Sequence, residues 1–146
     1  MSHLPLTKTL PALTLAFGLM ASVSAAAELV IGMQQEPTSL DPTADATASI
    51  DSMMTQNVFE SLTTVAENGE VQPNLAASWE VSEDGLTYTF TLAEGVTFHD
   101  GSTLDAEDVV YSFERAMGED SVNPSKDIFE PIESVKAVDS QTVEIT

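Results

Sequence analysis

The most informative part of the chain is LAASWEVSEDGLTYTFTLAEGVTFHDGSTLDAEDVVYSFERAM, residues 75–117. Apolar side chains at every second position of residues 86–92 alternate with threonines. This two-residue period predicts a strand with one buried apolar face and one hydroxylated face turned outward. Residues 78–82 alternate in the same way, and the Glu-Asp-Gly sequence between the two runs favours a tight hairpin turn.

A helix is expected after a loop at residues 98–102. Asp105 is suited to cap its N-terminus, because the carboxylate can accept hydrogen bonds from first-turn N–H groups. The acidic residues 107 and 108 add negative charge at the positive end of the helix dipole. Gly118 is placed to end the helix in a left-handed C-cap. The predicted apolar face of the helix carries Val109, Val110, Phe113 and Met117.

Residues 84–115 resemble the signature segment of the family 5 extracellular solute-binding proteins, the oligopeptide, dipeptide and nickel receptors of ABC importers. Three further segments match in the expected order, at residues 40–42, 57–62 and 73–79. One departure is Ala93, where the family commonly has Arg or Lys. The resemblance implies an α/β chain that forms the N-terminal part of a two-lobed periplasmic-binding-protein fold of type II, with a β-rich subdomain.

Residues 1–27 are typical of a secretory signal peptide. A basic start containing Lys8 is followed by an apolar run at residues 10–23 and by small residues for cleavage. The run is short for a bilayer span, so a membrane anchor is the less favoured alternative. Residues 28–146 are then expected to be an incomplete N-terminal segment of a solute-binding domain, located in the periplasm.

The charge of the chain excludes some partners. All 24 acidic side chains but only three of the four basic ones follow residue 27, for a formal charge of −21. Such a surface repels nucleic acid and anionic lipid, so neither is expected as a partner. A solvated acidic surface is the expected role of this charge, and selection of cationic peptides is the alternative.

Candidate ligand contacts come from the region after residue 28. The apolar run at residues 29–31 suits a strand buried on both sides of an α/β sheet, and ligands in such sheets lie beyond the carboxyl ends of strands. In the resembling receptors this loop also lines the cleft. An ordinary exposed turn is the alternative, and turn chemistry is favoured for Asp41 and Pro42. The candidate ligand contacts are Gln34, Gln35, Glu36, Pro37 and Thr38.

The other segments complete the expected order of elements. Residues 44–62 suit a helix, residues 63–65 a short strand and residues 67–70 an Asn-Gly turn. Residues 126–129 suit a short helical turn, in which Phe129 is either a further ligand contact, as the resemblance implies, or part of a satellite core. A second hairpin is expected at residues 135–145. The aromatic residues expected in the core are Trp79, Tyr88, Phe90 and Phe113.

The sequence offers little for catalysis. His99, Asp100 and Ser102 could be written as a relay, but adjacent residues on a short loop do not reach one another. The acids at residues 105–108 are explained by helix capping, so no metal or other cofactor is expected. The resemblance implies a non-enzymatic monomeric receptor that closes around a small solute, above all a peptide, and delivers it to an ABC permease. The alternatives are a secreted hydrolase and a structural or adhesive envelope module.

Overall fold

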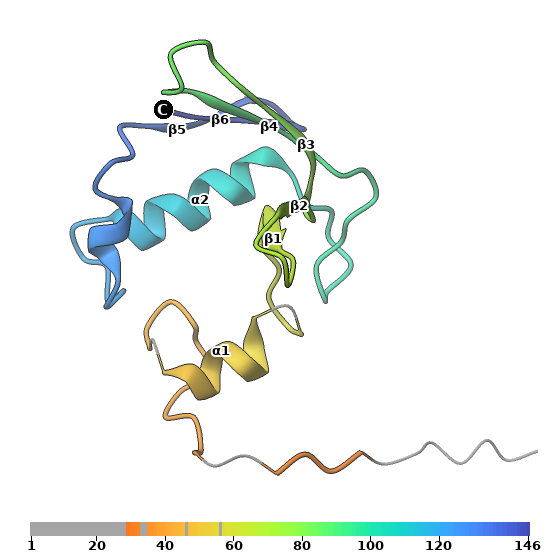
Figure 1. The fold of residues 1–146 in the computed structure, drawn as a ribbon, viewed down its shortest axis with the longest axis vertical. Coiled ribbons are helices and arrows are strands. Elements are labelled where there is room, and N and C mark those ends of the chain that lie inside the picture. Colours follow the sequence, from red (N-terminus) through yellow and green to blue (C-terminus); the bar gives the residue numbers. More distant parts are fainter. Residues whose placement is uncertain (1–28, 33–34, 46, 56) are drawn as a thin grey trace, which may run out of the picture. The chain divides into compact units, whose positions relative to one another are not determined.

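The computed structural model of the chain describes residues 29–32, 35–45, 47–55 and 57–146 (Figure 1). The predicted signal peptide and the candidate contact Gln34 lie outside these residues. Two units are distinguished, Met1–Gly32 and Met33–Thr146, and all helices and strands described below belong to the second. None of the helices in the described ranges is long and apolar enough to cross a membrane.

A four-stranded antiparallel sheet with the order β3-β4-β6-β5 is the main element of the second unit (Figure 1). Its strands are β3 (Ala76–Val81), β4 (Tyr88–Leu92), β5 (Val135–Asp139) and β6 (Thr142–Ile145). Phe90 pairs with Trp79 on one side and with Val143 on the other. Both predicted hairpins are confirmed.

The first hairpin turn is determined by Asp84 and Gly85. The Asp84 carboxylate accepts the Leu86 N–H at 3.1 Å and the Ser82 hydroxyl at 2.6 Å. Gly85 has a φ of 76°, in the left-handed region where glycine is favoured. The Ser82 N–H donates to the Thr87 carbonyl at 2.9 Å, so the loop is longer than a two-residue turn.

Helix α2 (Ala106–Met117) packs on one face of this sheet (Figure 1). Its N-terminus is capped as predicted, because Asp105 accepts the N–H groups of Glu107 and Asp108. The Asp108 carboxylate accepts the Asp105 N–H at 3.0 Å in return, which completes a capping box. The buried core between helix and sheet consists of Leu92, Ala106, Val109 and Val143.

The prediction of a left-handed C-cap at Gly118 is wrong. Gly118 has a φ of −53° and a ψ of 158°, although its N–H still donates to the Glu114 carbonyl at 2.8 Å. The Lys126 ammonium donates to the Gly118 carbonyl at 2.6 Å. A cation therefore approaches the negative end of the helix dipole, where a left-handed residue would otherwise satisfy the carbonyl groups.

The expected aromatic core is only partly formed. Trp79 and Tyr88 each lie 6.4 Å from Phe90, measured between ring centroids. Tyr88 is 41% exposed, and Trp79, Phe90 and Phe113 are only partly buried. The apolar face of β4 is fully buried only at Leu92, because α2 covers that end of the strand.

The prediction of a buried strand at residues 29–31 is also wrong. Leu29, Val30 and Ile31 have no secondary structure, and their side chains are 81%, 82% and 73% exposed. A strand buried on both faces requires hydrogen-bonded neighbours, and no strand in the described ranges pairs with residues 29–31. An apolar tripeptide alone does not supply that environment.

The helix expected at residues 44–62 is much shorter. Helix α1 spans Ala48–Met54, with Ile50 and Met54 buried as predicted and Val58 43% exposed. Asp45 accepts the Thr47 N–H at 3.0 Å, and Thr55 is in an extended conformation. Local bonds from short polar side chains compete with helical bonds and limit the helix at its start.

The short strand, the turn and the helical turn predicted at residues 63–65, 67–70 and 126–129 are present, whereas the strand at residues 71–73 was not predicted. Strands β1 (Thr63–Val65) and β2 (Val71–Pro73) form a separate antiparallel pair. The turn between them contains Gly69 with a φ of 83°. The short helical turn η1 (Lys126–Phe129) is a 3₁₀ helix.

Candidate functional site

Short polar side chains shape residues 35–45, which we call the polar loop. Ser39 Oγ accepts the Asp41 N–H at 2.9 Å. Asp41 Oδ1 in turn accepts both the N–H of Thr43 at 2.9 Å and its hydroxyl at 2.6 Å. The Thr38 hydroxyl donates to the Asp45 carboxylate. These bonds within a few residues of sequence give the loop its turns without regular secondary structure.

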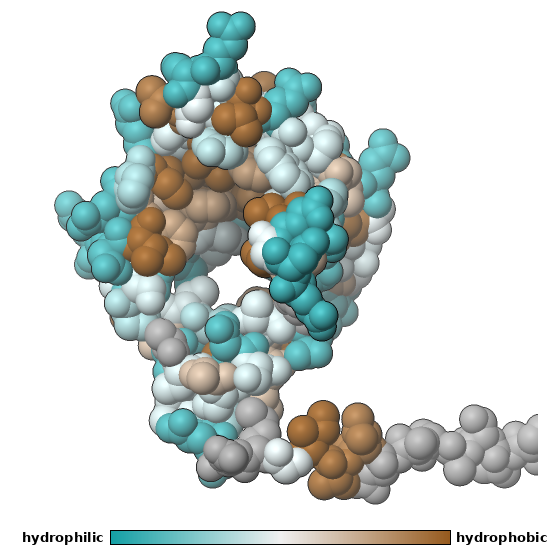
Figure 2. All heavy atoms as spheres, viewed as in Figure 1, coloured by the Kyte–Doolittle hydropathy of each residue, from teal (hydrophilic) through white to brown (hydrophobic). Residues whose placement is uncertain are grey.

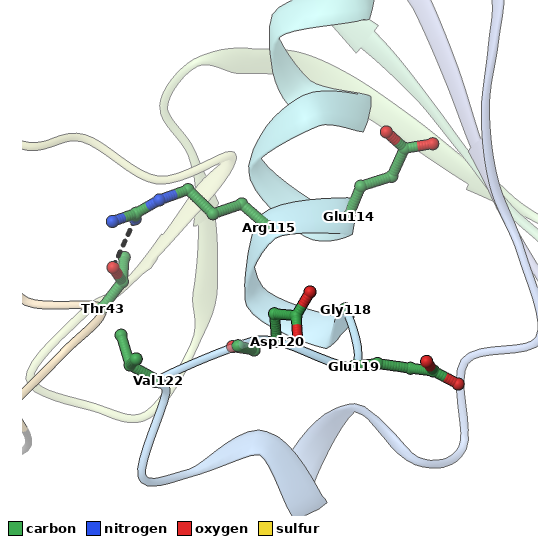
Figure 3. A pocket seen from close by; sticks show the side chains of 8 residues that line it. Thr43, Glu114, Arg115, Gly118, Glu119, Asp120 and Val122 are labelled. Carbon is green, nitrogen blue, oxygen red and sulfur yellow. Dashed lines mark hydrogen bonds between the residues drawn. The ribbon is translucent and has the colours of Figure 1, made fainter.

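Arg115, in the last turn of α2, connects the helix to the polar loop. Its Nη2 lies 2.9 Å from Asp41 Oδ2, and its Nη1 donates to Thr43 Oγ1. Figure 3 shows the Arg115 side chain extending from α2 toward Thr43, while Glu114 points to the other side of the helix. Asp41 is thus used in turn chemistry, as predicted, and also in an ion pair.

The ion pair was not anticipated from the sequence. Asp41 and Arg115 are 74 residues apart, and they lie in two of the matched segments, residues 40–42 and 84–115. The available signal was the scarcity of cations, because the chain contains four basic side chains against 24 acidic ones. Because carboxylates greatly outnumber cations, the sequence indicates that Arg115 forms an ion pair, but it does not indicate with which carboxylate.

The same contacts lower the pKa of Asp41. The hydrogen bond from the Thr43 hydroxyl, followed by that from Arg115, lowers the pKa of the Asp41 carboxyl from 3.8 to about 2. Both donors favour the ionised form of the carboxyl group. Asp41 is therefore a carboxylate at every ordinary pH, and the interaction with Arg115 persists over that range.

We predict that the Asp41 titration can be shifted by mutation. Since its folded pKa is depressed, the stabilising contribution is present above pH 3.8 and is lost as the pH falls through about 2. Thr43→Val removes the largest cause and should move the midpoint toward 3.8, and Arg115→Gln, which removes a hydrogen bond and a positive charge, should move it in the same direction. A carboxyl ¹³C NMR titration measures this midpoint. A midpoint near 3.8 in the unmodified protein would contradict the prediction.

A small hollow of about 310 Å³ adjoins the Arg115 side chain (Figure 3). It is lined by Thr43, Glu114, Arg115 and residues 118–122. Carboxylates predominate among its charged groups, with Glu114, Glu119 and Asp120 against the single guanidinium. The hollow lies at the C-terminal end of α2, beside the attachment of the polar loop.

A larger hollow of about 670 Å³ is mainly apolar. Figure 2 shows apolar atoms gathered over α2 and beside β1, around an opening in this face. Its walls include part of the apolar face of β4 that α2 leaves uncovered. Its apolar lining includes Leu62, Phe90, Phe98, Val109, Phe113 and Ile145.

The predicted contact residues lie in different environments. Gln35 and Glu36 are exposed, Pro37 is partly buried, and Thr38 is bonded to Asp45. Phe129 packs edge-on against Phe113, with ring centroids 6.0 Å apart. Because Phe113 packs against the buried core, this contact favours the satellite-core role of Phe129, and its role as a ligand contact stays a prediction.

The residues considered for catalysis do not form a relay. Asp100 accepts the N–H of Ser102 at 2.9 Å and its hydroxyl at 2.7 Å, so this carboxylate shapes its own turn. His99 is exposed beside it. Within the described ranges, no group of three or more His, Cys, Asp or Glu residues could hold a metal ion.

A β-rich module with a capped helix and an attached polar loop corresponds to part of the α/β fold of type II periplasmic binding proteins. The family model of the bacterial extracellular solute-binding proteins, family 5, middle region, matches residues 70–146. The chain belongs to this family, and the resemblance noted in the sequence is confirmed.

Individual relatives bind different solutes. The glutathione-binding protein GsiB of Pectobacterium atrosepticum is 37% identical over 124 residues, which are 85% of this chain and 24% of that protein. NikZ of Campylobacter jejuni, solved in complex with Ni(L-His), has a TM-score of 0.67 and 33% identity over 77% of this chain and 22% of its own. OppA of Haemophilus influenzae, solved with the peptide RPPGFSPFR, has a TM-score of 0.70 and 25% identity over 75% and 25% of the two chains. The chain thus spans about a quarter of the length of the relatives it matches.

Proposed function

We propose that this protein is the solute-capturing component of an ABC importer and that its solute is a short peptide. The observation that carries the proposal is the 37% identity to a glutathione-binding protein over 85% of this chain. Glutathione is a modified tripeptide, and the OppA relative was solved with a peptide bound. In this proposal the protein is exported by residues 1–27 and works as a periplasmic monomer.

Capture by such a receptor depends on closure of two lobes around the solute. A solute shifts the protein toward the closed state only by the difference between its affinities for the closed and open states. Contacts from both lobes that form on closure supply this difference. In the proposal, the polar loop provides contacts of one lobe through Gln35, Glu36 and Thr38, and the closed receptor delivers the solute to the permease in the inner membrane.

The proposal assigns the protein no catalytic step. The arrangement of His99, Asp100 and Ser102 supports this part, because Asp100 is bonded to Ser102 and occupied in its turn. A hydrolase would need the carboxylate to orient a general base against a nucleophile. The expectation is therefore that the solute is released chemically unchanged.

Calorimetric titration of the purified protein with reduced glutathione tests the proposed solute class. We expect saturable binding of glutathione at one site, with the solute recovered intact by mass spectrometry. Met-Leu and the Ni(L-His) complex serve as comparison probes in the same buffer. If only Ni(L-His) bound, the proposed solute would have to be a metal complex and not a peptide. Recovery of cleaved glutathione would favour the hydrolase.

A further inference from the structure

We propose that Arg115 is a positioning residue for solute capture. It holds the polar loop on α2 and so determines where the exposed side chains of residues 35 and 36 lie relative to the sheet. The role of these side chains rests on the proposed function, but the attachment of the loop does not. Arg115 acts through Asp41 and Thr43 and does not itself touch the solute in this proposal.

Asp41 couples the internal shape of the loop to the helix. One carboxylate oxygen, Oδ1, accepts the N–H and the hydroxyl of Thr43 and closes the turn. The other oxygen, Oδ2, receives Arg115 Nη2 at 2.9 Å. The turn and its attachment to α2 therefore share the Asp41 carboxylate, so a change in one is transmitted to the other.

The guanidinium group suits this task better than an ammonium group. Arg115 delivers Nη1 to Thr43 Oγ1 and Nη2 to Asp41 Oδ2, so its planar fork spans two acceptors on the loop. A lysine at this position would be a point charge on a flexible stem and would not reproduce the two fixed directions. Arg115→Lys should keep the attraction but lose much of the orientation.

The choice of partner is specific. Glu114 and Glu119 line the same small hollow, yet Arg115 pairs with a carboxylate 74 residues earlier in the chain. Among the described residues, Arg115 and Asp41 form the one ion pair between side chains. Arg115 thus joins the polar loop to the helix and does not pair with the carboxylates nearest to it in sequence.

The exposure of the pair indicates that it positions the polar loop and adds little to the free energy of unfolding of the whole protein. The side chains of Arg115 and Asp41 are 45% and 40% exposed. Ion pairs with this exposure contribute little to global stability, because water and salt screen them. The same pair can still restrict a loop that has no regular secondary structure, since it limits the positions open to one short segment.

Fluorescence energy transfer in the full chain can test this attachment. The sequence contains one tryptophan, Trp79, and no cysteine, so Glu36→Cys provides a unique site for an acceptor dye. Time-resolved measurements give the distribution of distances between Trp79 and residue 36. We expect a single narrow distribution in this labelled protein and a broad one after Arg115→Gln, with Arg115→Lys intermediate.

Lys126→Gln is the matched control. It removes the same charge at the same end of α2, but Lys126 donates to the Gly118 carbonyl and not to the loop. Its distance distribution should stay narrow, and the circular dichroism of both charge variants should match that of the parent. A narrow distribution in Arg115→Gln, or equal broadening in Lys126→Gln, would overturn the attachment.

Glutathione titration of the unlabelled variants tests the consequence for capture. Since a pre-organised loop reduces the cost of binding, Arg115→Gln should weaken glutathione affinity roughly tenfold and Lys126→Gln less than about twofold. A broadened distance distribution in Arg115→Gln together with an unchanged affinity for glutathione would contradict the positioning role. If the parent protein does not bind glutathione, the proposed solute fails, and the distance measurement alone still decides whether Arg115 holds the loop.

Discussion

Leu92→Ala is expected to lower the free energy of unfolding by about 2–5 kcal/mol, the usual range for truncating a buried leucine. Leu92 is 2% exposed and belongs to the buried core between the sheet and α2. Its removal leaves a cavity against Ala106 and Val109, where the backbone of a paired strand and a capped helix limits collapse. Urea unfolding followed by far-ultraviolet circular dichroism measures the change.

Leu86→Ala provides a control for the same substitution. Leu86 belongs to the same alternating run but is 68% exposed, just before β4 begins. Its truncation should change the free energy of unfolding by less than about 0.5 kcal/mol. Similar effects of the two substitutions would mean that the core is not centred on the Leu92 end of the strand.

Val143→Thr should destabilise the protein by about 1–3 kcal/mol through one buried hydroxyl group. Val143 is 0% exposed and is packed among apolar core residues. The substitution changes the side-chain volume little, so the loss reports the cost of burying a polar group. Thermal and urea unfolding of the variant would both show it.

Val138→Thr is the matched control in the same hairpin. Val138 lies in β5 and is 60% exposed, so its hydroxyl would be hydrated. We expect a change within about 0.5 kcal/mol. If Val143→Thr also left the free energy of unfolding unchanged, the hydroxyl group at residue 143 would be hydrogen-bonded to protein or water. That result would contradict the burial of this position among apolar side chains.

Features that depend on residues close in sequence were predictable. The capping role of Asp105 requires only N–H groups two and three residues later, and the structure contains both bonds. The turn at Gly85 and the strand alternation around it also arise within a few residues. The family resemblance rested on such segments, and two of them, residues 73–79 and 84–115, lie within the residues 70–146 that the family model matches.

Features that depend on distant parts of the chain were predicted less well. Residues 29–31 have the composition of a buried strand, but burial requires partner strands that composition does not supply. Residues 44–62 have an apolar stripe, yet polar side chains before Ala48 favour local turns over helix. At Gly118, Lys126 from the following turn interacts with the carbonyl in place of a left-handed cap.

The candidate site shows the same division. From the sequence alone, the polar loop could be recognised as turn chemistry, and its residues could be proposed as solute contacts. Only the tertiary structure revealed that Arg115 reaches Asp41 across 74 residues and that Phe129 packs on Phe113.

By itself, the sequence determined the acidic composition of the protein, its family, and the hairpin and capped helix, because each is encoded in composition or in contacts a few residues apart. The tertiary structure decided which apolar positions are buried and which carboxylate Arg115 pairs with. These properties depend on the packing of α2 against the sheet and on the distance between side chains from remote segments. No local pattern contains that distance, since chain folding creates it.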